Sequence, residues 1–459
     1  MKLPLDIETD VPADRRTLIL GLAWPALAEN ILTTLVSMVD MIMVGVLGAY
    51  AIGAVGLVTQ PRFLMLAAFQ ALSVGATAMV SRFKGAGDRE NANKVLHQSL
   101  ILTTWISLIL CFIMFFADEA LIRFLAGGNI SEEMILGGHA YLRIQVYGFP
   151  TLAYTFTINA VLRGVGNTRA AFYNSMVSNL VNVFFNYCLI GGNLGFPMLG
   201  VAGASIATVI GQCAALGMAL SKVMTGREFI RIDFKKLLRA DLSIIRRMLK
   251  IGIPAFIEQL IMRTGMMLYT IIVTSLGDHS YAAHMIAMNL QQFSFMTGMS
   301  FGTAATTLVG QCLGRVRADL AKVYVKMTQN LSYIASALVS VFLFFCGGLI
   351  ASLYTKDPEL ALLSANMLKI IAIVNPISNA RFVYTSALRG AGDSRFAAVI
   401  TFVGNLVVRP ILSVILVFPP FPFQLGLAGI WIAMSSDGLI CYVLSRFRFL
   451  QGKWAGIKV

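Results

Sequence analysis

The sequence predicts an all-α integral membrane protein, with twelve transmembrane helices arranged as two parallel six-helix repeats. Of its 459 residues, 57% are hydrophobic and only 13% are charged, which is about half the charged share of an ordinary soluble protein. Apolar stretches long enough to cross a bilayer recur along the chain, and the second half repeats motifs of the first. A soluble globule of this length could not cover its surface with so few charged side chains.

Twelve apolar stretches, each bounded by charged or turn residues, are the expected transmembrane helices. At about 20 apolar residues per span plus short loops, the chain fits twelve helices and leaves little room for a large soluble domain. The first apolar run is too long for the core of a cleavable signal peptide, so none is expected. The spans, in order, are 17–45, 51–81, 95–117, 139–162, 170–190, 198–222, 247–275, 281–311, 326–351, 361–388, 395–418 and 425–448.

The positions of the basic residues predict which loops face the cytoplasm. Of the 36 Lys and Arg residues, 28 lie in the amino terminus, in the connections that follow even-numbered spans and in the carboxyl-terminal tail. The opposite loops hold only Arg123 and Lys356. Under the positive-inside rule, both termini are therefore cytoplasmic. The net charge of +14 then reflects topology and anchoring to lipid headgroups, and no nucleic-acid partner is expected.

Two matching segments indicate an internal repeat. Leu162–Arg169 reads LRGVGNTR and Leu388–Arg395, 226 positions later, reads LRGAGDSR; nearer the start of each half, Glu29 matches Glu258 at an offset of 229. Six spans per repeat, an even number, make the two copies parallel, as in transporters that rock two lobes around a substrate. The expected domains are an amino-terminal lobe at 1–222, a basic cytoplasmic linker at 223–250 and a carboxyl-terminal lobe at 251–459.

Asp40, in the first span, is the main candidate for coupling transport to an ion gradient. An ionisable group at bilayer depth costs at least about 2.5 kcal/mol, so its presence needs a reason. Polar side chains on the fifth and sixth spans can surround it, and a dry pocket favours the uncharged form of a carboxyl group, as a proton carrier requires. The alternative is that Asp40 only joins helices by hydrogen bonds. The expected coupling residues are Asp40, Asn179, Asn182, Asn186 and Thr208.

A polar stripe on the first span is repeated in part on the seventh. Glu29 and Asp40 are 11 residues apart, about 20° around a helix, and Thr33 shares their face. The seventh span carries Glu258 and Tyr269 at the same spacing. Methionines crowd this region and adapt to irregular apolar ligands, although core packing and helix linking are the alternatives. The substrate-cavity candidates are Glu29, Thr33, Glu258, Tyr269, Arg263, Met262, Met266, Met288 and Gln291.

Four more ionisable residues stand within the expected spans. Asp437 can pair with Arg409 or with Arg263, and Arg62 is the repeat equivalent of Gln291. We interpret Arg62 as a residue that links helices. His284 can sense pH, but a single histidine more often has a packing role.

The sequence lacks the motifs of several other membrane-protein classes. No GxxxxGK[ST], HExxH, GxSxG or TVGYG-like segment occurs, which argues against a nucleotide-driven pump, a hydrolase and a potassium channel. The six cysteines lie singly in apolar runs, without metal-ligand spacing. We therefore expect no enzyme activity, no cofactor and no metal site, with an ion gradient as the energy source.

The doubled LRGxG[ND][ST]R loop, the twelve spans and the Gly45–Gly48 run after Asp40 resemble the multidrug and toxic compound extrusion (MATE) family over essentially the whole chain. The resemblance implies export of amphipathic, often cationic organic compounds by proton or sodium antiport. It matches Asp40 to the aspartate that DinF-like members use for coupling, and Asn182 to an asparagine beside it. Asn186 stands where many such members have an aspartate, which weakens a sodium site, because sodium prefers several oxygen ligands including charged ones.

The resemblance leaves the branch of the family mixed, with a DinF-like leaning. Glu258 fits an acid that the NorM-like branch has on the seventh span. That branch also has an acid on the tenth span, where this sequence offers only Asn366, Asn375 and Asn379.

We therefore expect a proton-coupled antiporter that exports amphipathic, often cationic compounds by rocking of two lobes, with Asp40 as proton carrier. One alternative is a sodium-coupled drug antiporter. Another is a flippase for a lipid-linked saccharide, which would need Arg62, Arg263 and Arg409 to converge on a pyrophosphate. The expected partners are small organic molecules, H⁺ or Na⁺, and the bilayer. Short loops and no targeting extension predict a bacterial cytoplasmic membrane, and we expect a monomer to be functional.

Overall fold

The computed structural model describes residues 12–126, 131–226, 228–233, 240–355, 357–418 and 424–457. Within these ranges the regular elements are helices and no strand occurs, so the all-α fold class is confirmed. The elements are α1 (Pro12–Gly45), α2 (Ala49–Gly85), α3 (Arg89–Ala126), α4 (Glu132–Gly164), α5 (Thr168–Gly191), η1 (Asn193–Gly195), α6 (Gly200–Met224), α7 (Leu242–Thr274), α8 (Asp278–Gly314), α9 (Ala318–Tyr354), α10 (Pro358–Gly390), α11 (Ser394–Phe402), η2 (Val403–Val408), α12 (Arg409–Val417), α13 (Gly426–Leu450) and η3 (Lys453–Gly456).

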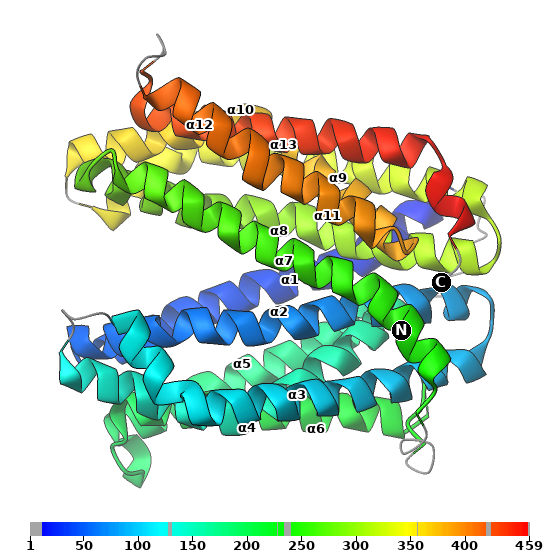
Figure 1. The fold of residues 1–459 in the computed structure, drawn as a ribbon, viewed down its shortest axis with the longest axis horizontal. Coiled ribbons are helices and arrows are strands. Elements are labelled where there is room, and N and C mark those ends of the chain that lie inside the picture. The colour runs from blue at the N-terminus through cyan, green and yellow to red at the C-terminus, as the bar shows by residue number, and fades with distance from the viewer. Residues whose placement is uncertain are drawn as a thin grey trace. The chain divides into compact units, whose positions relative to one another are not determined.

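The twelve expected spans correspond in order to α1 through α10, to the α11–η2–α12 segment and to α13 (Figure 1). Most helices run beyond the apolar stretch that predicted them; α3, for example, begins at Arg89 rather than at residue 95. Charged residues can continue a helix into the polar layer beside a membrane, and hydropathy does not register them. Among the described residues, nine helices are long and apolar enough to cross a membrane.

The chain divides into two compact units, each described here by itself. One unit comprises Met1–Leu27 and Ile253–Val459, and the other comprises Ala28–Gly252. The division falls inside α1 and α7, so both helices contribute residues to both units. In the Ala28–Gly252 unit, α5 packs along α6 and α2 along α4; in the other unit, α10 packs against α8, α9 and α13.

The basic linker expected between the lobes is described only in part. Arg227 and residues 234–239 lie outside the described residues, as does Lys356 of the expected outer loops. Just before residues 234–239, the Asp233 N–H donates to His97 Nε2 of α3 at 2.9 Å. The described part of the linker is therefore bound to α3, and the expected domain boundaries stay a prediction.

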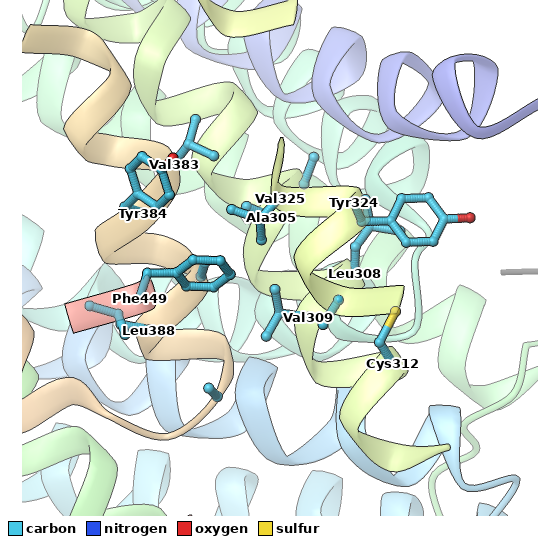
Figure 2. Packing of buried hydrophobic residues seen from close by; sticks show 14 of the residues in the cluster. Ala305, Leu308, Val309, Cys312, Tyr324, Val325, Val383, Tyr384, Leu388 and Phe449 are labelled. Atoms are coloured by element: carbon cyan, nitrogen blue, oxygen red, sulfur yellow. The ribbon is translucent and has the colours of Figure 1, made fainter. Parts of the chain in front are cut away.

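A hydrophobic cluster in the unit of Met1–Leu27 and Ile253–Val459 joins α1, α8, α9, α10, α11 and α13, and Figure 2 shows part of it. Leu308 of α8, Tyr324 of α9, Leu388 of α10 and Phe449 of α13 are all buried in it. Because Leu388 directly precedes Arg389 in the LRGAGDSR segment, this cluster holds the helix end from which the second doubled loop starts.

The two doubled loops end their helices in the same way. In the first, the Asn167 N–H donates to the Leu162 carbonyl at 2.9 Å, and the second loop repeats this bond at 2.8 Å. The preceding residues, Gly166 and Gly392, have φ angles of 91° and 92°. Only glycine adopts this left-handed conformation without a steric penalty, and the bond is that of a Schellman motif. The second glycine of the LRGxG motif therefore has a backbone role.

The eleventh span is not a regular α-helix. Between α11 and α12 lies the π-helical turn η2, and α12 begins with Arg409 and Pro410. Proline has no N–H to donate to the turn before it, which favours a local departure from α-helical bonding. A methyl group added at Gly404 of η2 would overlap the Asp437 carboxyl and the Cys441 sulfur, so η2 lies directly against α13.

Candidate functional site

Asp40 of α1 lies against two asparagines of α5. Asn186 Nδ2 donates to Asp40 Oδ1 at 2.7 Å and to Asn182 Oδ1 at 3.3 Å. Both asparagines are buried, whereas Asp40 is half-buried. Their spacing of four residues puts the two amides on one face of α5. The carboxyl group therefore sits at the edge of a polar cluster within the lobe and keeps one side open.

The amide of Asn182 can face Asp40 with either its nitrogen or its oxygen. With the nitrogen toward the acid, it donates to Asp40 Oδ1 at 2.9 Å and Oδ2 at 3.1 Å, and its oxygen accepts from the Thr208 hydroxyl at 3.2 Å. With the oxygen toward the acid, its nitrogen donates to Thr208 Oγ1 at 3.2 Å. A carboxylate accepts hydrogen bonds only, while a carboxylic acid also donates one. The two amide orientations therefore suit the two protonation states of Asp40.

Two further polar residues belong to this unit. The positive charge of Arg62 on α2 attracts the Asp40 carboxylate. Asn179 Nδ2 is buried and has no hydrogen-bond partner among the described residues. The structure thus brings four of the five expected coupling residues together by hydrogen bonds and leaves Asn179 outside that chain of bonds.

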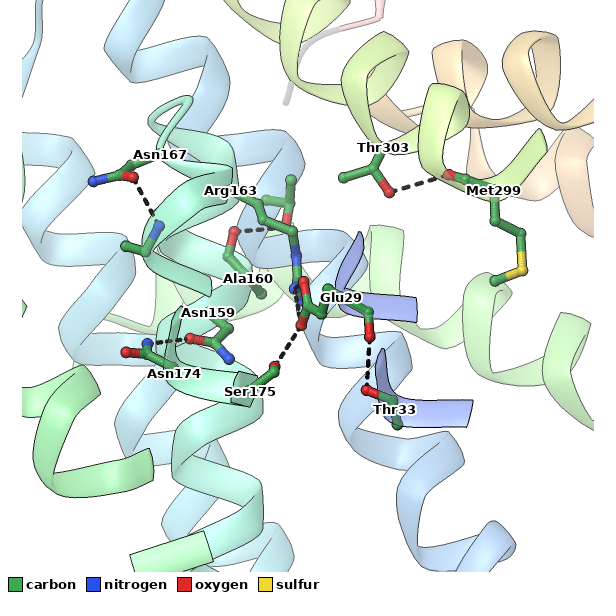
Figure 3. Close-up of polar contacts among 12 residues, drawn as sticks. Glu29, Thr33, Asn159, Ala160, Arg163, Asn167, Asn174, Ser175, Met299 and Thr303 are labelled. Atoms are coloured by element: carbon green, nitrogen blue, oxygen red, sulfur yellow. Dashed lines mark hydrogen bonds and ion pairs between the residues drawn. The ribbon is translucent and has the colours of Figure 1, made fainter. Parts of the chain in front are cut away.

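Glu29 of α1 forms an ion pair with Arg163, the arginine of the first LRGxG loop (Figure 3). Arg163 Nη1 lies 3.5 Å from each carboxylate oxygen, and Ser175 Oγ of α5 donates to Oε1 at 2.8 Å. The Thr33 hydroxyl bonds back to the Glu29 backbone carbonyl at 2.8 Å. Glu29 therefore links the start of its unit to the ends of α4 and α5.

Glu258 of α7 makes the same arrangement in the other unit. Arg389, the arginine of the second LRGxG loop, donates to Glu258 through Nε at 3.2 Å and through Nη2 at 2.5 Å. Thr401 Oγ1 donates to the same carboxylate at 2.8 Å. Ser175 and Thr401 are 226 positions apart, as are the two arginines. Each copy of the repeat therefore contains an acid, an arginine and a hydroxyl in equivalent places.

A second buried charge cluster lies in the Ile253–Val459 unit. Asp437 of α13 accepts a hydrogen bond from Arg409 Nε at 2.9 Å. Of the two arginines that the sequence offered as partners, Arg409 and Arg263, Arg409 is therefore the one that pairs with Asp437. Arg381 Nη1 of α10 lies 3.6 Å from the other carboxylate oxygen. The Arg409 guanidinium stands over the Tyr269 ring, 5.3 Å from its centroid. The His284 ring contacts the same tyrosine, with centroids 5.3 Å apart.

The other substrate-cavity candidates lie along α7 and α8. Met262 and Arg263 are half-buried and Met266 is exposed. Met288 packs against a hydrophobic cluster that also includes residues of α9, α10, α12 and α13. Gln291 is fully buried, and neither its oxygen nor its nitrogen has a hydrogen-bond partner among the described residues.

A protein-family model described as MatE matches residues 25–188 and 254–415, which together make up most of the chain. The chain belongs to the MatE family. The two matched stretches correspond to the two copies of the internal repeat. The resemblance expected from the LRGxG loops is thereby confirmed.

Curated relatives match this MatE protein over nearly its whole length. The "Probable multidrug resistance protein NorM" of Thermotoga maritima is 30% identical over 446 residues, 97% of this chain and 94% of the relative. The "Multidrug resistance protein MdtK" of Pectobacterium atrosepticum is 27% identical over 443 residues, 94% of each chain. The "Uncharacterized transporter YisQ" of Bacillus subtilis is 26% identical over 449 residues, 96% of each chain.

Solved structures share the fold of this MatE protein. One, described as the outward-facing conformation of a multidrug resistance MATE family transporter of the MOP superfamily, has a TM-score of 0.88 at 21% identity. The match covers 96% of this chain and 97% of the solved chain. Another, a MATE protein in the bent conformation, has a TM-score of 0.87 at 21% identity, with 96% of each chain covered. The family's described members are membrane transporters, and the DinF-like leaning stays a prediction.

Sequence reasoning missed the partners of the two glutamates in this MatE protein. Arg163 and Arg389 were read as parts of a loop motif, and Ser175 and Thr401 were not singled out. The offset of 226 that aligns the loops also aligns this serine with this threonine. A search for polar residues that recur at the repeat offset would have found both sets.

Proposed function

We propose that this protein is a proton-coupled antiporter that exports amphipathic, often cationic organic compounds, with Asp40 as the residue that carries the proton. The observation that carries the proposal is the amide cluster around Asp40, in which Asn186 donates at 2.7 Å and Asn182 can present either a donor or an acceptor. An acid in such surroundings can be held both with and without its proton.

The Asn182 amide supplies a means of relaying the state of Asp40. When Asp40 is ionised, the amide nitrogen donates to it and the amide oxygen accepts from Thr208. When Asp40 takes up a proton, its hydroxyl donates to the amide oxygen and the amide turns over. The bond to Thr208 then reverses direction, so protonation changes how α5 is tied to α6. Movement of the lobes between outward-open and inward-open states follows from this exchange.

Two considerations support this substrate class and energy source. Two of the curated relatives are described as multidrug resistance proteins, and both match this chain over more than nine-tenths of its length. Asn186 and, in one orientation, Asn182 point N–H groups at Asp40, whereas sodium prefers oxygen ligands. A proton therefore fits this cluster better than a sodium ion does.

The alternative functions stay predictions. A sodium-coupled antiporter would need the Asn182 oxygen and other oxygens to turn toward the Asp40 site. For the lipid-linked saccharide flippase, Arg62 belongs to one unit while Arg263 and Arg409 belong to the other. Within its own unit Arg409 is already paired with Asp437, so it is not a free cation for a pyrophosphate.

The test uses purified protein in sealed liposomes with a fluorescent organic cation as substrate. A pH gradient and a sodium gradient are imposed in turn on wild type, on Asp40→Asn and on Asp14→Asn. Asp14 lies on the same helix as Asp40 but is exposed near its start, so this variant controls for the loss of one acid. We expect uptake that follows the proton gradient in wild type and Asp14→Asn and is lost in Asp40→Asn.

Either of two results would overturn the proposal. Uptake driven by the sodium gradient alone would mean that sodium, not the proton, is the coupling ion. Proton-driven uptake that survives in Asp40→Asn would mean that a residue other than Asp40 carries the proton. Transport under neither gradient would favour the flippase.

The remaining expectations on cellular context belong to this proposal. We propose a bacterial cytoplasmic membrane, cytoplasmic termini and a functional monomer. Labelling of cysteines introduced at residues 15 and 453 by a membrane-impermeant reagent, in sealed and in permeabilised spheroplasts, tests the orientation, because both positions must label only after permeabilisation opens the cytoplasmic side.

A further inference from the structure

The second charge cluster contains more positive than negative charge. Asp437 is fully buried and lies between Arg409, on α12, and Arg381, on α10. Its Oδ2 accepts from Arg409, and its Oδ1 accepts from the Cys441 thiol at 3.2 Å. One carboxylate therefore faces two guanidinium groups.

Among the described residues of the unit, no other acid is placed to balance the second arginine. After residue 253 the only acidic residues well inside helices that cross the membrane are Glu258 and Asp437. Glu258 is already held by Arg389 and Thr401. His284, which contacts Tyr269 on its other side, cannot supply negative charge in either protonation state. The cluster therefore carries a net charge of about one positive unit, which is costly at membrane depth.

Arg381 is the arginine with donors to spare. Its guanidinium makes one long contact with Asp437, 3.6 Å, and stacks on Phe382, 5.0 Å from the ring centroid. Among the described residues it donates no hydrogen bond, and its side chain is 16% exposed. A guanidinium group carries five N–H donors, so most of those on Arg381 have no acceptor in the described part of the chain.

One buried polar group without a partner among the described residues lies beside this cluster, and two more lie on α13 and α8. Ser378, one turn before Arg381, lies against Gly438, the residue after Asp437, and its hydroxyl has no partner among the described residues. Trp431 Nε1 is likewise buried without an acceptor within the described chain, beside His284. Gln291 is about 20° around α8 from His284 and is unpartnered at both polar atoms among the described residues. Buried polar groups are nearly always hydrogen-bonded, so such a group points to a ligand.

This cluster and the Asp40 site contain equivalent positions of the internal repeat, but their charges differ in sign. Tyr269 is the equivalent of Asp40 at the offset of 229, and Asp437 is the equivalent of Gly211 at the offset of 226. Gly211 adjoins Asn182 in its lobe, as Asp437 adjoins Arg409 in the other. Where the first copy has an acid among amides, the second has two arginines and one acid.

We propose that the cluster of Arg381, Arg409 and Asp437 is a binding site for a monovalent anion, either a halide ion or the carboxylate group of a small molecule. The anion binds the free donors of Arg381 and balances the excess charge, and Ser378 supplies a further donor. This proposal does not rest on the antiport function. It concerns the carboxyl-terminal lobe alone and predicts occupancy whether or not an organic cation is exported.

The test measures thermal unfolding of the purified protein in buffers of equal ionic strength that contain sodium gluconate, sodium bromide or sodium acetate. Gluconate serves as the reference because its six-carbon chain makes it much larger than bromide or acetate. We expect bromide to raise the unfolding midpoint saturably, by at least about 2 °C. Crystals grown in bromide should show an anomalous peak within hydrogen-bond distance of Arg381. Acetate that matches bromide shows that the site accepts carboxylates as well as halides, and acetate without effect assigns it to halides.

Matched variants separate the site from general salt effects. Arg381→Gln removes the excess charge and should lose the bromide shift. Lys369→Gln removes one positive charge from an exposed position of the same helix and should keep it. Asp437→Asn adds one more unit of excess positive charge and, if it folds, should bind bromide more tightly. An unfolding midpoint that is equal in bromide, acetate and gluconate, or a bromide shift that persists in Arg381→Gln, would overturn the proposal.

Discussion

Asn182 differs from the other polar residues of its cluster because both ends of its amide are used. Replacing it with leucine removes the donor to Asp40 and the partner of Thr208 while keeping a similar volume. A hydrogen bond to a charged group contributes about 1.5–3 kcal/mol, which is a factor of ten or more. We therefore expect proton-driven uptake by Asn182→Leu to fall at least about tenfold.

The liposome assay measures this change, and equilibrium binding of the fluorescent substrate in detergent is its control. Binding should stay within a few-fold of wild type, because Asn182 acts through Asp40. Asn193→Leu, which changes an amide beyond the end of α5, should transport normally. Loss of binding in Asn182→Leu would instead place this residue in the substrate site.

The two glutamate–arginine pairs hold helices together, and they differ in strength. Glu258 is buried and bound by Arg389 at 2.5 Å, whereas Glu29 is 3.5 Å from Arg163 with both side chains partly exposed. Removing one partner of a buried pair costs about 3–5 kcal/mol, and a partly exposed pair contributes less. We expect Glu258→Gln to lower the unfolding midpoint markedly more than Glu29→Gln does, as measured by thermal unfolding in detergent.

A double-mutant cycle distinguishes a pair from two independent residues. Glu258→Gln combined with Arg389→Gln should be more stable than Glu258→Gln alone, because no unpaired charge is left. Additive losses would show that the pairing contributes nothing to stability.

At the level of single residues, the sequence predicted which side chains matter better than it predicted their partners. Asp40 and Asn186 were expected to meet, because charge at membrane depth and helical spacing are visible in sequence. The pairing of Glu29 with Arg163 was not, because Arg163 was assigned only to the loop motif that ends the fourth span. Arg381 escaped notice because its importance depends on the buried acid that it faces.

Among the helices, the connections between them offer the sharpest test of the repeat. The Schellman ending of α2 uses Gly87, with a φ of 72°, and its equivalent after α8 at the offset of 229 is Val316, with a φ of 60°. A β-branched residue is strained in this conformation by about 1–2 kcal/mol. Val316 is 88% exposed, so its side chain contributes little packing.

Val316→Gly should therefore stabilise the protein by about 1 kcal/mol, seen as a higher unfolding midpoint. Gly87→Val is the matched control, because nothing lies within 4 Å of a Cβ atom placed at Gly87. It should destabilise by a similar amount. A lower midpoint for Val316→Gly would mean that flexibility of the unfolded chain outweighs the relief of strain.

The number and order of the helices could be predicted from hydropathy, but their ends and one interruption could not. Hydropathy stops where charged residues begin, so it misses helical turns such as the one that starts at Arg89. The π-turn η2 depends on Pro410 together with close packing on α13. The hydropathy of an apolar stretch is the same whether or not the helix contains a π-turn, so hydropathy does not reveal it.

For the whole molecule, coupling to one proton limits how far a substrate can be concentrated. A proton supplies about 1.4 kcal/mol per pH unit and about 2.3 kcal/mol per 100 mV of membrane potential. One unit of pH with 100 mV thus allows about 500-fold accumulation of a neutral substrate. For a monovalent cation the charge movements cancel, and the same conditions allow only about tenfold.

This difference can be measured by adding a potassium diffusion potential to liposomes that already carry a pH gradient. We expect the potential to leave export of a monovalent cation unchanged and to increase export of an uncharged substrate. A cation whose export responds to the potential would show that more than one proton moves in each cycle.

The π-turn in the eleventh span has a consequence for how the two lobes diverged. Thr168–Gly191 and Ser394–Val417 correspond residue by residue, so Val408 is the counterpart of Asn182. A π-turn takes up about one extra residue, which advances the chain beyond it by about 100° around the axis. Arg409 then takes the orientation that Asn182 has in the first copy. The winding of η2 thus brings the guanidinium group of the second lobe to this place, and deleting one residue of η2 should turn Arg409 away from Asp437.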